Sequence, residues 1–306
     1  MTREQLIEQI TSEVLKALAA QGVSLNSTGD LSGVIQSAVQ SATPTSNVNR
    51  MTEDILRDLA EAEYKDTIQL DAPQNPLALR AMENATTARV GIGRNGERLS
   101  TRALLSLRAD HAMAKDAVMK AVDESLLARL NLPMIQSRCT EINEHLTRPD
   151  LGRQLSPEAE QFLRTQCVQH PQIQVYVSDG LSNSAVENNI EDVLSILMDG
   201  LKADGIKTGT PFFVKFGRVP TMDAISDVVG AELTCVLLGE RPGLAASDSM
   251  SAYITYGAYV GIPESKRTVV SNIHKNGIQP VEAGAYLVEL LERILREKKS
   301  GVDLQL

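Results

Sequence analysis

The sequence predicts an α/β protein, with a doubly wound parallel sheet in its C-terminal part and a mainly helical region before it. Three observations predict this fold. After Pro171, short β-rich runs alternate with apolar stripes at helical spacing. The run at 233–238 is apolar on both faces, as expected of a strand buried inside a sheet. Before residue 150, helical periodicity and loop composition prevail, with little strand signal.

The N-terminal region begins with an amphipathic pattern. Residues 1–22 carry one apolar stripe at helical spacing, which predicts a helix that either docks elsewhere as a tag or packs on its own domain. Residues 23–50 are rich in Ser, Thr, Asn and Gly and predict a flexible linker. Helical patterns follow at 52–63 and, in one or two pieces, at 100–130, so residues 51–165 are expected to be mainly helical.

Strands and helices are expected to alternate through residues 166–306. The strands are predicted at 173–177, 212–216, 233–238, 252–256 and 267–270, and the helices at 190–201, 225–229 and 280–299. Parallel strands end at the same edge of a sheet, where ligands bind. We therefore expect the loops at Ser178–Gly180, Gly217–Val219 and Gly239–Gly243 to converge on one ligand crevice. Within the first of these loops, Asp179 or Ser182 is expected to cap the following helix, and its N–H groups suit a phosphate.

Charge and composition exclude several classes of protein. The chain of 306 residues has a formal net charge of −9, which disfavours a general nucleic-acid binder. No stretch approaches the length of apolar residues that crosses a membrane. The three Cys residues are scattered, as is usual in a reducing cytoplasm. We expect a cytoplasmic protein with no nucleic-acid or membrane partner.

One glycine motif suggests an alternative function. Gly91–Gly96 reads G-x-G-x-x-G, which could bind a nicotinamide cofactor if a buried strand preceded it and a helix followed directly. Because the segment before it is polar and the predicted sheet lies some 80 residues later, a Gly-rich loop at an interface is the favoured interpretation.

Two histidines also have competing interpretations. Asp110-His111 could form an acid–base pair, but a salt-bridged surface patch is more common at helical spacing. The segment Asn272–Gly277 approximates D-x-H-x-x-G, through which some cobalamin proteins supply a His to cobalt. Here Asn272 replaces the Asp that would orient the ring of His274, so a polar loop residue is favoured. No metal site and no catalytic triad, P-loop or kinase signature is found.

Several strings, in order and at similar spacing, carry a resemblance to a known family. Over residues 85–300 the chain resembles the small subunit of ethanolamine ammonia-lyase, an adenosylcobalamin-dependent enzyme. The matching strings are Ala88–Val90, Gly93–Gly96, Thr101–Leu105, Ala109–His111, Leu146–Arg153, Val177–Ser182, Gly209–Val214, Gly217–Val219, Gly239–Leu244 and Ser271–His274.

The resemblance implies a Rossmann-like domain, residues 166–306, that contacts adenosylcobalamin at the interface with a large subunit. Residues 51–165 would contact that partner, in an oligomer of six large and six small chains. The implied cofactor contacts are Val219, Glu240 and Val269, with Arg241 and Ser271 as further polar contacts. Family members can carry Cys at position 269, and a main-chain contact there would survive the change. The family keeps benzimidazole on cobalt, which argues further against His274 as a ligand.

The implied reaction converts ethanolamine to acetaldehyde and ammonia. The cobalt–carbon bond breaks homolytically, and the adenosyl radical takes a hydrogen from the substrate. Because this chemistry belongs to the cofactor, no catalytic acid, base or nucleophile is assigned to this chain. The family is commonly packaged in a bacterial microcompartment, which favours residues 1–22 as a packaging tag that contacts the shell. The alternatives are a nicotinamide-binding oxidoreductase using Gly91–Gly96 and a non-catalytic assembly or scaffold protein.

Overall fold

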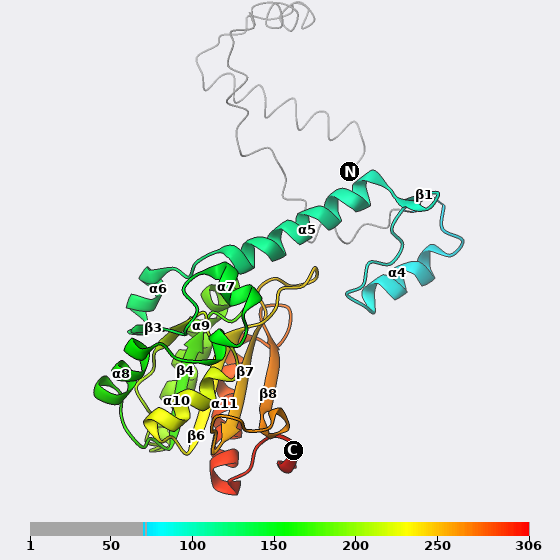
Figure 1. The fold of residues 1–306 in the computed structure, drawn as a ribbon. Coiled ribbons are helices and arrows are strands. Elements are labelled where there is room, and N and C mark those ends of the chain that lie inside the picture. The colour runs from blue at the N-terminus through cyan, green and yellow to red at the C-terminus, as the bar shows by residue number, and fades with distance from the viewer. Residues whose placement is uncertain (1–69, 71, 306) are drawn as a thin grey trace, which may run out of the picture. The chain divides into compact units, whose positions relative to one another are not determined.

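The computed structural model of the chain describes residue 70 and residues 72–305, which belong to one compact unit, Asp58–Leu306. The expectations for 1–22, 23–50 and 52–63 therefore lie outside the described residues. The elements in chain order (Figure 1) are α4 (Pro76–Asn84), β1 (Arg94–Asn95), β2 (Arg98–Leu99), α5 (Thr101–Met119), α6 (Glu124–Arg129), β3 (Met134–Gln136), α7 (Ile142–Thr147), η2 (Leu151–Arg153), α8 (Pro157–Gln166), β4 (Ile173–Ser178), α9 (Asn183–Ala203), β5 (Phe213–Lys215), α10 (Thr221–Val229), β6 (Leu233–Gly239), β7 (Met250–Tyr256), η3 (Glu264–Lys266), β8 (Thr268–Ile273), α11 (Pro280–Glu297) and η4 (Gly301–Asp303).

Six strands form the main sheet, in the order β3-β5-β4-β6-β7-β8. The first four are parallel, whereas β7 runs antiparallel to both β6 and β8. The sheet is thus mixed: the prediction of parallel strands is confirmed for β4, β5 and β6 but wrong at β7, which pairs antiparallel with both of its neighbours. The reason is the connection: a loop without a helix joins β6 to β7, and a parallel return needs a longer crossover.

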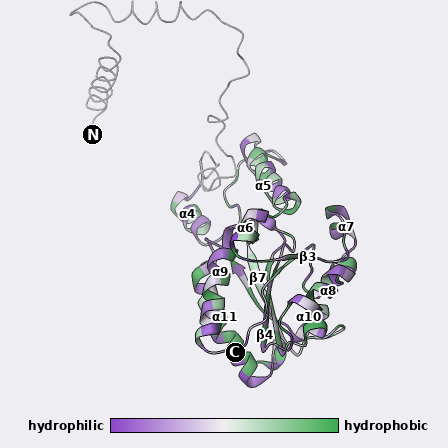
Figure 2. Ribbon diagram, turned by 90° about the vertical axis from the view of Figure 1, so that its left-hand side faces the viewer, coloured by the Kyte–Doolittle hydropathy of each residue, from purple (hydrophilic) through white to green (hydrophobic). Residues whose placement is uncertain are grey.

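Helices cover both faces of this sheet, as Figure 2 shows. Helices α9 and α11 lie on one face and α8 and α10 on the other. Strands β4 and β6 are buried along their whole length, which explains their nearly continuous apolar sequence. The predicted stripe on α9 is also buried, at Ile190, Val193, Leu194, Leu197 and Leu201. No helix among the described residues has both the length and the apolar character to cross a membrane.

The strand order reverses direction at β4. The chain passes from β4 through α9 to β5, and then through α10 back to β6 on the other side of β4. Because α9 follows β4 and α10 follows β5 on opposite faces of the sheet, the loops after β4 and β5 diverge at this point, where open α/β sheets bind ligands.

Strand β3 was not predicted. Its three residues lie inside the range expected to be mainly helical, and they pair with Phe213, Val214 and Lys215 of β5. A run this short carries no periodic signal, so its pairing with β5 decides its conformation.

Candidate functional site

The three predicted loops do converge at the carboxyl ends of β4, β5 and β6. The N–H of Leu181 donates to the carbonyl oxygen of Gly239 at 2.9 Å. The carboxylate of Asp179 accepts from the N–H of Phe216 at 2.6 Å and from the N–H of Gly217 at 3.1 Å. These bonds join the end of β4 to the ends of both neighbouring strands.

Asp179 connects two loops and does not cap the helix that follows it. The hydroxyl of Ser182 caps α9 by accepting from the N–H of Ala185 at 3.1 Å, and it donates to the carbonyl oxygen of Ser247 at 2.8 Å. Burial raises the pKa of the Asp179 carboxyl to about 7, against the opposing effect of the N–H groups of Phe216 and Gly217. The side chain therefore serves as a buried internal partner for backbone N–H groups.

Two glycines allow the strand ends to approach so closely. Gly180 has φ +56°, and a Cβ atom on it would lie 2.3 Å from the carbonyl oxygen of Gly239. A Cβ atom on Gly239 would lie 2.1 Å from the carbonyl oxygen of Ser182. Any side chain at either position would force the backbones apart.

His145 of α7, which the sequence did not single out, lies under the same loops. Its Nε2 atom is 2.6 Å from the carbonyl oxygen of Gly180, and its ring stacks on Phe216 with centroids 5.4 Å apart. The guanidinium of Arg218 donates to the carbonyl oxygen of His145 at 2.5 Å. Burial lowers the pKa of His145, so the ring is held neutral as part of the loop framework.

Four of the five predicted cofactor contacts belong to the sheet face that α10 covers or to the loops at its edge. Across the strands, Val236 pairs with Tyr253 and Tyr253 pairs with Val269, so the three side chains point to one face. Val219 packs on the core of that face, and Val269 is 45% exposed. By alternation, Ser271 also takes this face.

Glu240 completes this surface, which we call the shelf and define as Val219, Glu240, Tyr253, Val269 and Ser271. The hydroxyl of Tyr253 donates to Oε1 of Glu240 at 3.0 Å. Arg241, the fifth predicted contact, is exposed in the loop after β6 and lies next to Glu240 in the chain. Tyr253 was missed because only the register of β7 and β8 places it between Val236 and Val269.

A buried ion pair fixes the strand that carries Val269. Arg267, just before β8, donates to both carboxylate oxygens of Asp223 on α10, each at 2.8 Å. The two side chains are only 2% and 5% exposed. The pair therefore joins β8 to α10, which begins two residues after Val219.

The remaining motifs form local structure. Gly91–Gly96 contains β1 and the first residue of the two-residue turn that joins it to the antiparallel strand β2. Among the described residues, no buried strand precedes the motif, and no helix follows it directly. The geometry for a dinucleotide is therefore lacking. Asp110 is buried and forms an ion pair with Arg89. This pair joins two of the strings that carry the resemblance. The neighbouring His111 is exposed.

His274 is a buried residue of a turn. Its Nε2 atom lies 2.9 Å from Oδ1 of Asn272, and its Nδ1 atom accepts from the N–H of Asn276 at 3.4 Å. Both ring nitrogens thus have partners inside the loop, as the polar-loop interpretation predicts. Within residue 70 and residues 72–305, no group of three or more His, Cys, Asp or Glu side chains could hold a metal ion. Cys139, Cys167 and Cys235 are free and buried.

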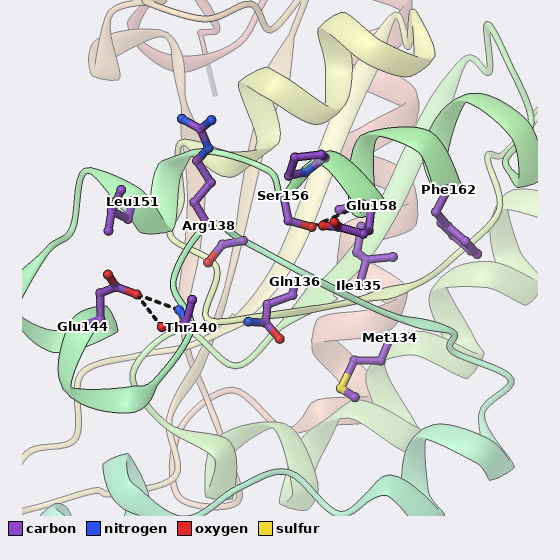
Figure 3. A pocket seen from close by; sticks show the side chains of 13 residues that line it. Met134, Ile135, Gln136, Arg138, Thr140, Glu144, Leu151, Ser156, Glu158 and Phe162 are labelled. Atoms are coloured by element: carbon purple, nitrogen blue, oxygen red, sulfur yellow. Dashed lines mark hydrogen bonds between the residues drawn. The ribbon is translucent and has the colours of Figure 1, made fainter.

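A cavity of about 890 Å³ lies elsewhere, at the outer edge of β3 (Figure 3). Met134, Ile135 and Gln136 of β3 line it together with Phe162 of α8. None of the predicted cofactor contacts lines it, so the cavity and the shelf are separate features.

Fold and site together define an α/β protein in which three strand-end loops converge where the strand order reverses, with the shelf on the sheet face that α10 covers. The family model for the ethanolamine ammonia-lyase light chain (EutC) matches residues 77–305. The chain belongs to this family, whose members are subunits of a carbon–nitrogen lyase.

Curated relatives agree with this membership. The chain is similar to the ethanolamine ammonia-lyase small subunit of Fusobacterium nucleatum, with 44% identity over 306 residues and the whole of both chains covered. The small subunit of Clostridium tetani is 49% identical over 82% of this chain and 85% of its own. That of Listeria monocytogenes is 41% identical over 90% of this chain and 95% of its own.

Proposed function

We propose that this chain, as the small subunit of ethanolamine ammonia-lyase, holds adenosylcobalamin on the shelf at the interface with a large subunit. The assembled enzyme would convert ethanolamine to acetaldehyde and ammonia. The observation that carries the proposal is the shared face of Val219, Val269 and Ser271, with Glu240 bonded to that face through Tyr253. These positions come from distant parts of the sequence, and one large ligand would contact them together.

The residues of the shelf fit such a cofactor. Val219 and Val269 offer an apolar surface for the flat corrin ring, and the carboxylate of Glu240 can accept hydrogen bonds from its amide side chains. Val269 contributes aliphatic and main-chain contact where family members can carry Cys. The bound cofactor supplies the radical chemistry through its cobalt–carbon bond, while this chain orients the ring and excludes water from one side. We also propose that residues 166–306 form a Rossmann-like domain that contacts the cofactor.

The large subunit would cover the shelf and the N-terminal helices. Several apolar side chains of α4 and α5 are exposed: Leu77 (84%), Met82 (53%), Leu105 (46%), Met113 (41%) and Met119 (47%). Exposed apolar side chains grouped on neighbouring elements are typical of protein interfaces. They favour residues 51–165 as the region that contacts the partner. The assembled oligomer would contain six large and six small chains, and native mass spectrometry would measure its mass.

The first test is gel filtration of this chain with adenosylcobalamin, with and without the large subunit, followed by visible spectroscopy of the eluted protein. We expect cobalamin to elute with the complex only, with its benzimidazole still on cobalt. If the chain alone retained cobalamin with the benzimidazole displaced, His274 would be the ligand and the proposed shelf would be wrong.

Residues 1–22 would package the enzyme in a bacterial microcompartment within the cytoplasm. Their apolar stripe includes Leu15, so Leu15→Glu should abolish co-purification with shells and leave activity unchanged. Gln9→Glu, which adds a charge outside the stripe, is the matched control. Unchanged packaging of Leu15→Glu would contradict the tag. If deletion of residues 1–50 removed activity as well, the assembly role would be the better description of the chain.

A further inference from the structure

Tyr253 occupies the centre of the shelf. In β7 it lies across from Val236 on one side and Val269 on the other, and its ring packs on the core beneath α10. Its hydroxyl donates to Oε1 of Glu240 at 3.0 Å. One side chain therefore links the loop after β6 with the edge strand β8.

This hydrogen bond decides where the Glu240 carboxylate points. Glu240 stands at the end of β6, half-buried, and its backbone N–H donates to the carbonyl oxygen of Ser249 at 2.9 Å. The backbone is thus fixed, but a glutamate side chain still has several rotamers. The bond from Tyr253 selects the rotamer that lies over the shelf. Within the described part of the chain, no second residue bonds the carboxylate, so Oε2 is left to accept from a ligand.

The hydroxyl of Tyr253 is a permanent donor. Burial, together with the neighbouring Glu240 carboxylate, raises the pKa of Tyr253 to about 12. The phenol consequently keeps its proton throughout the physiological range, and the direction of the hydrogen bond to Glu240 does not change with pH.

We propose that Tyr253 is a positioning residue for the cofactor: it holds Oε1 of Glu240 so that Oε2 meets an amide N–H group at the rim of the corrin. This assignment rests on the proposed function. It adds to the expected contacts a residue that acts through Glu240, and it predicts that the phenol affects binding of the cofactor and not the chemical step.

The test uses the complex of this chain with its large subunit and compares Tyr253→Phe with Tyr256→Phe. Tyr256 lies on the same strand, is half-buried and packs on the opposite face, so the control removes an equivalent hydroxyl away from the shelf. The dissociation constant for adenosylcobalamin is measured by absorbance titration in the dark without ethanolamine. The KM for the cofactor and the kcat follow from activity.

We expect Tyr253→Phe to raise the dissociation constant and KM about tenfold, the usual effect of losing a hydrogen bond to a charged group, with kcat unchanged. Tyr256→Phe should match the wild type. In a Glu240→Ala background, Tyr253→Phe should have almost no further effect, because no carboxylate is left to position. Thermal unfolding of each complex verifies that the fold is retained.

Three results would overturn the assignment. An unchanged dissociation constant for Tyr253→Phe, or a loss of equal size with and without Glu240, would show that the phenol does not act through the carboxylate. A lower kcat with unchanged KM would place the effect in the chemical step. A wild-type complex that binds no cobalamin would instead contradict the proposed function itself, which separates the two failures.

Discussion

The ion pair between Arg267 and Asp223 gives the sharpest prediction about stability. Arg267→Met removes the charge but keeps an unbranched side chain, and it leaves the carboxylate of Asp223 buried without its partner. Both side chains are nearly inaccessible, at 2% and 5% exposure, and the two hydrogen bonds are each 2.8 Å long. Breaking a buried pair of this kind by removing one partner costs about 3–5 kcal/mol.

The other contacts of Arg267 change this figure little. Its Nε atom also donates to Glu264 at 2.6 Å, but that carboxylate is 66% exposed and screened by water. Glu264→Gln should therefore cost less than about 1 kcal/mol and serves as the matched control. Burial raises the pKa of the Asp223 carboxyl, and Arg267 opposes this effect, so the carboxylate depends on its partner.

The assay is urea unfolding of the full chain at pH 7.5, followed by far-ultraviolet circular dichroism. The double variant Arg267→Met/Asp223→Leu should be more stable than Arg267→Met, because no unpaired charge remains buried. The reasoning is refuted if Arg267→Met loses less than about 1 kcal/mol, or if the double variant loses the sum of the two single losses.

Three further predictions concern the strand ends. Because burial raises the pKa of Asp179 to about 7, the folded chain retains a proton that the unfolded chain releases above about pH 4. The wild type should lose up to about 4 kcal/mol of stability relative to Asp179→Asn between pH 4 and 8, and parallel pH profiles would contradict this. Gly239→Ala would bring a Cβ atom to 2.1 Å from a backbone oxygen and should cost about 2 kcal/mol or more, whereas Gly243→Ala, whose nearest such atom is 3.8 Å away, should be neutral in the same urea assay. Ser182→Ala removes the cap of α9 and should lower the free energy of unfolding by about 1–2 kcal/mol. Equal losses for Ser182→Ala and the exposed control Ser195→Ala would refute the capping argument.

The convergence of the strand-end loops could be predicted because it depends on local patterns. Apolar runs at β4 and β6, stripes on α9 and α11, and Gly-containing loops after the strands are all visible along the chain. The rule that parallel strands end at one edge then brings those loops together without further information. The bonds from Asp179 to the β5 loop confirm this convergence.

The partners within the site could not be predicted in this way. Asp179 looked like a helix cap, because a short polar side chain before a helix usually is one. Its carboxylate instead bonds backbone groups 37 and 38 residues away. His145 lies in a six-residue helix whose packing against Phe216 has no local sequence signal.

Local composition and periodicity, which are properties of neighbouring residues, determined the α/β class, the strands after Pro171 and the edge at which the loops meet. Tertiary structure alone decided the pairing of β3 with β5, the antiparallel return of β7 and the meeting of Tyr253, Glu240 and Val269 on one shelf. The physical reason is that register between strands depends on contacts between distant residues. A shift of one residue would turn Tyr253 to the opposite face.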